Sequence, residues 1–269
     1  MRRTALVTGA SAGIGEAFAR LYAGLGHDLV LTARRRDRLE RLGDELRASH
    51  GVRVLVTPAD LAVEGAPETI IAGVREAGMG LDVLVNNAGY GLGGGFGATD
   101  WENHARFMQV MVSAPTRLAH LAYAPMVRSG YGRIINVASL AGILPGGPGH
   151  TLYAASKAYL IRLSESLHAE GRAGGVHVSA LCPGFTFSEF HDVNQTRAQL
   201  SRITPSWMWM NADAVARAGW EACEKGRVVC VPGAVNRGLA LFAKLAPHSL
   251  AYGLMGAQSA RAGRTGNAV

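Results

Sequence analysis

Hydrophobic positions along the chain fall into two alternating patterns. Short, continuous apolar runs rich in Val, Ile and Leu are separated by longer segments in which apolar residues recur with helical spacing. Continuous apolar runs are typical of strands buried on both faces, and their alternation with helices indicates parallel strands covered on both sides. We therefore predict an α/β fold, a doubly wound parallel sheet of about seven strands, with a ligand crevice where the strand order reverses. The expected strands are residues 5–7, 29–31, 52–56, 83–85, 133–137, 176–181 and 228–231, and the expected helices are residues 13–25, 36–48, 64–77, 101–128, 152–173 and 212–224.

The chain is expected to form a single domain over residues 1–269, because 48% hydrophobic content suffices for one large core and no linker divides it. The longest connection, at about residues 184–211, is expected to be a lid over an apolar substrate. Packing of its side chains into the core is the alternative. An apolar extension at about residues 233–257 should pack against the body or a second subunit, which we favour over contact with a membrane surface. The large apolar side chains of the connection are Phe185, Phe187, Phe190, Trp207, Met208, Trp209 and Met210.

The net charge of +7 raises the question of nucleic-acid binding. Basic residues are spread along the chain, apart from arginines within residues 34–38, so we expect no nucleic-acid partner. Three cysteines without CxxC spacing indicate buried thiols in a reducing compartment. No metal site is predicted, because no two histidines stand four residues apart. We expect a cytoplasmic protein, since no apolar stretch has the form of a signal peptide or a membrane span.

A glycine-rich segment follows the first expected strand and opens the first expected helix. It reads TGASAGIG, from Thr8 to Gly15. Glycines allow a tight turn and a close approach of the backbone to a pyrophosphate, while the helix N-terminus supplies free N–H groups and partial positive charge. The spacing GxxxGxG differs from the more common GxGxxG. Its place between a strand and a helix predicts a site for the phosphates of a dinucleotide.

With this turn the sequence resembles the short-chain dehydrogenase/reductase family, whose signature turn is TGxxxGIG. The resemblance covers roughly residues 4–232 and implies a Rossmann-type sheet, a nicotinamide cofactor and assembly as a homodimer or homotetramer. Further motifs of the family stand after successive strands, as Asp60-Leu61, Asn86-Asn87-Ala88-Gly89, Ser139, Tyr153-Ala154-Ala155-Ser156-Lys157 and Pro183-Gly184. The cofactor-binding residues that the resemblance implies are Gly9, Ser11, Gly13, Ile14, Gly15, Asp60, Leu61, Asn86, Asn87, Ala88, Gly89, Tyr153, Lys157, Pro183, Gly184 and Ser188.

Individual roles follow from the same resemblance. Asp60 is expected to accept a hydrogen bond from the adenine amino group, with the backbone of Leu61 beside it. Asn86 is expected to lie against the adenosine ribose, while Asn87 mainly braces neighbouring strands. Ser188 stands where the family often has Thr, and it keeps a hydroxyl for the nicotinamide carboxamide.

Residues at the end of the second expected strand indicate whether the cofactor is NAD(H) or NADP(H). A ribose 2′-hydroxyl suits an acidic partner, whereas a 2′-phosphate needs cations. NAD enzymes of the family tend to carry Asp where this chain has Ala33, and Arg34 and Arg35 follow. A guanidinium can hold a phosphate by two parallel charge-assisted hydrogen bonds. We therefore predict NADP(H) as the cofactor; the alternative is that the arginines only solvate the start of a helix.

Tyr153 and Lys157 are the expected catalytic pair. They stand four residues apart in a helical pattern and so share one helix face. Hydride transfer to a carbonyl leaves an oxyanion that must gain a proton, and an unperturbed tyrosine, with a pKa of about 10, is too weak a base near neutrality. A neighbouring ammonium favours the phenolate, and Lys157 can also hold the nicotinamide ribose. Ser139, just after the fifth expected strand, completes a predicted catalytic triad by steadying the substrate oxygen.

One position departs from the family. Its members usually carry an Asn in the long fourth helix, which holds a water of a proton relay near the lysine. Here Met111 stands at that position, and a thioether is at best a weak acceptor and cannot donate. Ser113, two residues on, should face elsewhere on a helix. The relay is therefore rebuilt by other groups or absent.

Taken with the resemblance, these residues favour an NADP(H)-dependent oxidoreductase acting on a small apolar carbonyl or secondary alcohol. An NADP-binding sensor or scaffold with weak catalysis is the alternative, supported mainly by Met111. An epimerase or dehydratase of the extended branch of the superfamily is disfavoured, because such chains are typically longer. The identity of the substrate and the direction of the reaction do not follow from the sequence.

Overall fold

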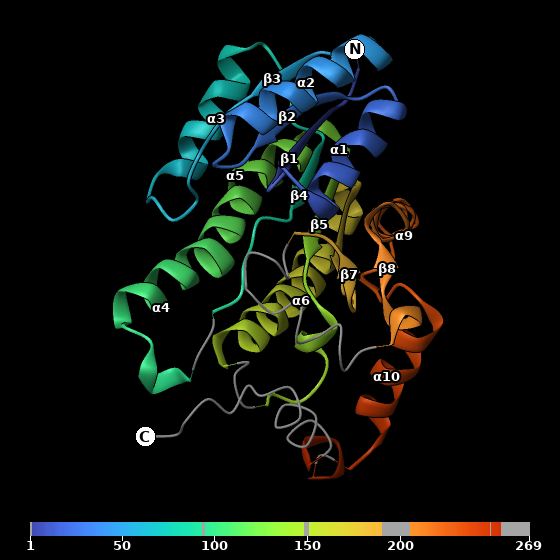
Figure 1. Ribbon diagram of the computed structural model, residues 1–269. Helices are drawn as coiled ribbons and strands as arrows, with labels where there is room; N and C mark the ends of the chain where they lie inside the picture. The colour runs from blue at the N-terminus through green and yellow to red at the C-terminus, as the bar shows by residue number, and fades with distance from the viewer. Residues whose placement is uncertain (1, 93–94, 148–150, 190–204, 248, 254–269) are drawn as a thin grey trace.

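A parallel sheet of seven strands forms the centre of the computed structural model, which describes residues 2–92, 95–147, 151–189, 205–247 and 249–253 (Figure 1). Every pairing in this sheet is parallel. The strand order is β3-β2-β1-β4-β5-β6-β9, so the chain reverses its direction across the sheet between β1 and β4. The predicted doubly wound α/β fold is confirmed. The strands are β1 Thr4–Thr8, β2 Asp28–Thr32, β3 Val54–Val56, β4 Val83–Asn86, β5 Gly132–Val137, β6 Val176–Leu181 and β9 Val229–Cys230.

Helices cover both faces of the sheet. Helices α1, α2 and α9 pack on one face, and α3, α4, α5 and α6 lie on the other (Figure 1). Each connects two parallel strands, which is why the chain needs a helical crossover between them. The helices are α1 Gly13–Gly24, α2 Arg36–His50, α3 Ala66–Glu76, α4 Trp101–Met108, α5 Ala114–Ser129, α6 Thr151–Gly171 and α9 Ala212–Glu224.

Side chains of each central strand alternate between two cores. In β1, Ala5 and Val7 belong to the core under α1 and α2, whereas Leu6 belongs to the core under α3 and α5. Because both faces are buried, polar residues have no place along most of the strand. This is the physical reason for the continuous apolar runs in the sequence.

The long helix expected over residues 101–128 is two helices joined by a π-helical segment. Between α4 and α5, Gln109–Ser113 widens into a π turn, and the N–H of Ala114 donates to the carbonyl of Gln109. Pro115, at the start of α5, has no backbone N–H for the carbonyl of Met111, so the regular helical bond cannot form there. Single π turns within helices are frequent at functional sites.

The two ends of the long connection after β6 meet in a small sheet. Strand β7, Thr186–Phe187, pairs with β8, Met210–Asn211. Phe187 stacks on Trp209 with ring centroids 5.2 Å apart, and Phe185 lies 5.4 Å from the same indole. Phe190, which we expected in the lid, falls outside the described residues.

The apolar extension begins with α10, Ala234–Leu245, which lies at the lower right of Figure 1. Leu241, Phe242 and Leu245 on this helix are exposed. Among the described residues, none of the helices has both the length and the apolar character that crossing a bilayer requires. Of the three cysteines, Cys182 and Cys223 are buried and Cys230 is half-buried, all as free thiols.

Candidate active site

The turn between β1 and α1 is a tight backbone turn suited to an anion. Gly9 and Gly13 have φ values of 66° and 58°, in the left-handed region that favours glycine. Gly15 packs so closely on the carbonyl of Gly9 that a Cβ there would collide with it. Ala12, which precedes α1, provides no side-chain cap, so the first N–H groups of the helix suit an external acceptor. A pyrophosphate fits these N–H groups and the positive end of the helix.

Asn87 ties the glycine turn to the end of β4. Its Nδ2 donates to the carbonyl of Thr8 at 2.9 Å, and its backbone N–H donates to Thr8 Oγ1 at 2.9 Å. The N–H of Ala88 reaches the same hydroxyl at 3.0 Å, and that hydroxyl donates to the carbonyl of Val85. The two strands that flank the reversal of strand order are thus locked together where the turn begins.

The side chain of Asn86 lies on the α5 face of the sheet. It is buried, and its Nδ2 donates to the carbonyl of Pro115 at 3.1 Å and to Asn136 Oδ1 at 2.9 Å. Side chains alternate along a strand, so Asn86 shares the α5 face with Leu84, while Asn87 reaches the glycine turn. A contact of Asn86 with the adenosine ribose would therefore be made by its backbone, and it stays a prediction. The side chain of Asn86 joins β4 to β5 and α5.

Asp60 and Leu61 follow β3 at the same edge of the sheet. Asp60 Oδ1 accepts the N–H of Ala62 at 3.0 Å, and Oδ2 forms an ion pair with Arg106 of α4. An ionised carboxylate has about four lone-pair sites, so Asp60 can accept a further hydrogen bond. Leu61 is buried in the core below.

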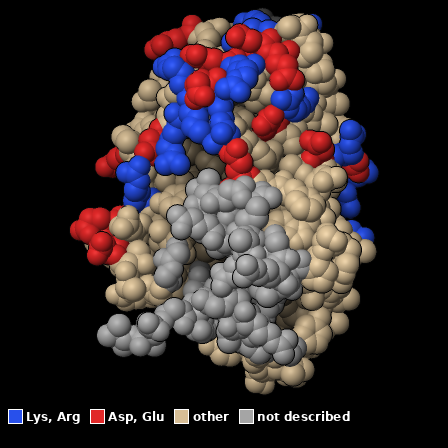
Figure 2. All heavy atoms as spheres, viewed as in Figure 1, with Lys and Arg blue, Asp and Glu red and all other residues tan. Residues whose placement is uncertain are grey.

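Arginines gather where β2 meets α2, beside the glycine turn. Arg34 is exposed, whereas Arg35 folds back so that its Nε and Nη2 donate to Ser11 Oγ at 3.2 and 3.0 Å. Figure 2 shows basic and acidic side chains concentrated over the upper half of the view, where α2 lies in Figure 1. A guanidinium therefore lies at the edge of the glycine turn, held by a residue of the turn itself. Cations at this position suit a phosphate better than a neutral hydroxyl.

Lys157 is a buried lysine, with 5% of its surface exposed. Its Nζ donates to the carbonyl of Val137 at 2.7 Å and lies 5.7 Å from the centre of the Tyr153 ring, one turn earlier on α6. Burial disfavours the charged form and lowers the pKa of Lys157 to about 8. The ammonium form therefore still predominates at pH 7, close to the phenol it is expected to influence.

Ser139 lies on a short turn that packs directly on α6. A Cβ at Gly142 in this turn would be 2.6 Å from the backbone carbonyl carbon of Lys157. Ser139 itself is half-buried, and its Oγ accepts the N–H of Ala141 at 3.1 Å. The structure therefore brings the serine turn, Tyr153 and Lys157 together at the carboxyl end of β5.

The turn after β6 closes the other side of the site. The N–H of Leu140 donates to the carbonyl of Pro183 at 2.9 Å, which links the serine turn to the Pro183-Gly184 turn. Asn236 of α10 is buried against Gly184, where a Cβ would be 2.4 Å from Asn236 Oδ1. Its Nδ2 donates to the carbonyl of Pro232 at 2.9 Å. The contact of Asn236 with this turn was not foreseen. The sequence indicates it only by a polar residue at the start of an apolar stretch.

Met111 lies within the π-helical segment, next to the lysine. A Cβ at Gly89 would be 2.9 Å from Met111 Sδ and 3.8 Å from Lys157 Nζ. Met111 is 1% exposed, whereas Ser113 is exposed. The thioether thus lies next to Lys157, where it offers the ammonium at best a weak acceptor and cannot donate.

Two more residues of the connection after β6 lie against the glycine turn or the arginines beside it. Ser188 lies on the turn, because a Cβ at Gly13 would be 2.8 Å from Ser188 Cβ. The next residue, Glu189, forms ion pairs with Arg35 and Arg38. Sequence reasoning missed Glu189, and the available signal was a carboxylate in a connection otherwise noted for aromatic residues. Ile14, also expected at the cofactor, packs against the core below the turn.

Comparison with known proteins places this site in a family. The family model described as short chain dehydrogenase matches residues 3–198. The chain belongs to the short-chain dehydrogenase/reductase family. Nodulation protein G from Rhizobium sp. (strain N33) is 35% identical over 246 residues, which cover 89% of this chain and 97% of that protein. The family resemblance stated from the motifs is confirmed.

Solved structures of the short-chain dehydrogenase/reductase family share the whole architecture. A short-chain dehydrogenase from Sphingobium yanoikuyae in complex with NADPH aligns with a TM-score of 0.78 and 34% identity, covering 89% of this chain and 92% of that one. A short chain dehydrogenase/reductase from Burkholderia phymatum in complex with NAD aligns with a TM-score of 0.79 and 27% identity, covering 90% of this chain and 92% of that one. The protein is thus an oxidoreductase of a family that binds a nicotinamide cofactor. Members with either form of the cofactor have this fold.

Proposed function

We propose that this protein is an NADP(H)-dependent oxidoreductase that transfers a hydride between nicotinamide and a carbonyl or secondary alcohol of an apolar substrate. The observation that carries the proposal is the buried Lys157 ammonium, 5.7 Å from the Tyr153 ring, on the helix against which the Ser139 turn packs. A buried lysine costs stability, so its retention beside a phenol at the carboxyl edge of the sheet favours a chemical role.

The side chains of this site supply the proton and the stabilisation of charge that the reaction needs. When bound, the cofactor supplies the hydride. Tyr153 gives its hydroxyl proton to the oxygen that the hydride leaves negative, and Ser139 donates a hydrogen bond to the same oxygen. The Lys157 ammonium stabilises the resulting Tyr153 phenolate. In the oxidative direction the phenolate takes the proton of the alcohol.

The residues present fit a cofactor that carries a phosphate on its adenosine ribose. Arg35 is already held beside the glycine turn by Ser11, and Arg34 is exposed one residue before it. Ala33 leaves no carboxylate at the position where a ribose 2′-hydroxyl would need one. Charge-assisted hydrogen bonds from guanidinium groups to phosphate are among the strongest in proteins.

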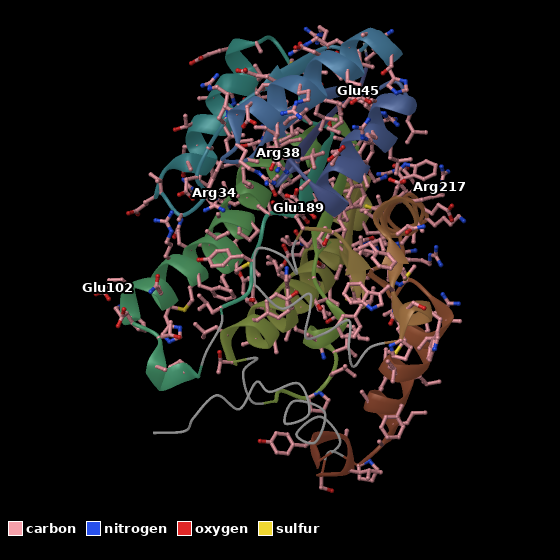
Figure 3. All side chains as sticks on the ribbon, in the orientation of Figure 1. Arg34, Arg38, Glu45, Glu102, Glu189 and Arg217 are labelled. Carbon is pink, nitrogen blue, oxygen red and sulfur yellow. The ribbon has the colours of Figure 1, made fainter. Side chains whose placement is uncertain are left out.

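Arg34→Asp is expected to lower the preference for NADP over NAD by about 10- to 100-fold, because a charge-assisted hydrogen bond is lost and a repulsive carboxylate is introduced. The measurement is the ratio of kcat/KM for the two reduced cofactors with one substrate. Arg217→Asp is the matched control, since Arg217 is an exposed arginine on α9, away from the arginines beside α2 (Figure 3). An unchanged ratio in Arg34→Asp would contradict the assignment of NADP(H).

An apolar substrate is supported by the aromatic side chains of the connection after β6. Phe185, Phe187 and Trp209 form one cluster where the two ends of the connection meet, and Trp209 is buried within it. The cluster lies next to the Pro183-Gly184 turn and so can form an apolar wall beside the reacting groups. We infer that the connection at residues 184–211 contacts the body of the substrate.

The test of the proposed function is NADPH consumption by the purified protein with a panel of ketones and aldehydes of increasing apolar size. Turnover that rises with apolar bulk supports the proposal. The second candidate is an NADP-binding sensor or scaffold with weak catalysis, which Met111 favours because a thioether cannot donate a hydrogen bond where the family usually has an Asn. Tight binding of NADPH without consumption across the panel would select this candidate instead.

A further inference from the structure

Glu189 connects the segment after β7 to the arginines beside the glycine turn. One carboxylate oxygen accepts from Arg35 Nη1 at 2.8 Å, and the other accepts from Arg38 Nη1 at 2.6 Å. In Figure 3, Glu189 and Arg38 point toward each other, while Arg34 lies to one side of the pair. Ser188, the preceding residue, rests on Gly13 of the turn. The carboxylate is therefore placed at the edge of the proposed cofactor site by contacts on both sides.

We propose that Glu189 competes with the 2′-phosphate of NADP(H) for Arg35 and Arg38, and so sets how strongly this protein distinguishes NADP(H) from NAD(H). The inference rests on the proposed function, since Arg35 is one of the two arginines assigned to the phosphate and Arg38 shares Glu189 with it. When the phosphorylated cofactor binds, the carboxylate must give up the guanidinium groups. The unphosphorylated cofactor makes no such demand, so Glu189 lowers affinity for one form only.

The hydrogen bonds of Arg35 support competition. Its Nε and Nη2 are used by Ser11, and its Nη1 is used by Glu189. A guanidinium has five N–H donors, so one hydrogen of Nη1 remains, but a phosphate that forms two parallel bonds with this guanidinium must share it with an acceptor that is already present. Hydrogen bonds from Arg38 and then Arg35 hold the pKa of Glu189 below its usual value, so the carboxylate is ionised at neutral pH. A carboxylate and a phosphate held at the same arginines would repel each other.

The ion pairs are weak enough to be exchanged. Side chains of Arg35, Arg38 and Glu189 are each 39–40% exposed, and ion pairs of such exposure contribute little to stability because water screens them. A phosphate monoester carries a charge of about −1.5 to −2 at pH 7, against −1 for the carboxylate. The greater charge favours the phosphate in the exchange. Arg34, whose guanidinium Glu189 does not contact in the described structure, provides an additional cation for it.

Glu189→Gln is expected to strengthen binding of adenosine 2′,5′-bisphosphate about three- to tenfold, because the neutral amide keeps the shape of the side chain without its charge. Binding of adenosine 5′-monophosphate should change less than about twofold. Isothermal titration calorimetry of the full chain with both nucleotides measures the effect without any turnover. Glu102→Gln is the matched control, because Glu102 is an exposed glutamate on α4, distant from the arginines in Figure 3. It should leave both affinities unchanged.

Four outcomes are distinct. Tighter binding of the bisphosphate alone in Glu189→Gln supports the competition. Equal tightening of both nucleotides overturns it, because the carboxylate then acts only through general charge. Unchanged or weaker binding of the bisphosphate also overturns it, and weaker binding would mean that Glu189 positions the arginines. If wild type does not distinguish the two nucleotides while the variant does, the proposed NADP preference fails and the competition stands.

Discussion

Tyr153→Phe is expected to lower kcat by about 10²–10⁴-fold, the usual contribution of a positioned acid or base, while NADPH binding stays close to wild type. The change removes one oxygen and with it the proton that the substrate oxyanion must receive. The Lys157 Nζ stays bonded to the carbonyl of Val137, so the site should keep its shape. Turnover with the best substrate of the ketone panel and calorimetric binding of NADPH are the two measurements.

Tyr159→Phe is the control for this experiment. Tyr159 lies on the same helix but is 37% exposed, and its hydroxyl is 2.9 Å from Thr116 Oγ1, outside the site. The same chemical change should leave kcat within about twofold, as expected for a surface substitution. If Tyr153→Phe kept near-normal turnover, Tyr153 would not be the proton donor and the proposed mechanism would be wrong.

Lys157→Met is expected to abolish most turnover and at the same time to stabilise the protein at pH 7. The pKa of Lys157 is lowered from 10.5 to about 8 by burial, which means that folding opposes the protonated form. A shift of this size corresponds to about 3 kcal/mol at most, and we expect a gain of about 1–3 kcal/mol after the loss of the hydrogen bond to Val137. Stability would then be gained where function is lost, as is common at catalytic sites.

The pH dependence of the stability gained by Lys157→Met shows whether the gain comes from removing the buried charge or from better packing. Between pH 8 and 10.5 the unfolded chain holds the lysine proton while the folded chain releases it, so wild-type stability rises with pH in this window. The Met variant lacks that rise. Urea denaturation at pH 7 and pH 10 should therefore show a large advantage of the variant at pH 7 and a much smaller one at pH 10. An advantage equal at both values would show that the charge of Lys157 is not its source.

Much of the fold could be predicted because it depends on local patterns that tertiary packing reinforces. The runs around Val7 and Ile134 are continuous and apolar since both faces of the sheet are covered, and this distinguishes them from the helices between them. The glycine turn was recognisable because Gly9 and Gly13 adopt backbone conformations that few other residues tolerate. Tyr153 and Lys157 could be paired because helical spacing alone puts them on one face.

The features that could not be predicted depend on contacts between distant parts of the chain. The role of Asn86 in joining β4 to β5 and α5 was not foreseen, because the orientation of its side chain follows from where β4 ends, which the sequence leaves uncertain by a residue or two. The π turn before Pro115 arises from one missing N–H and gives no periodic signal. Glu189 meets Arg35 across more than 150 residues of sequence, so no local pattern joins them.

The contact between Gly142 and the backbone of Lys157 has a practical consequence for redesign of the protein. Backbone atoms, unlike side-chain tips, cannot rotate out of the way, so the separation of the serine hydroxyl from the lysine helix is fixed by the main chain itself. Efforts to broaden the range of accepted ketones can therefore vary the aromatic cluster around Trp209 without disturbing the reacting groups. Position 142, in contrast, should stay glycine, because any Cβ there would collide with the backbone of Lys157.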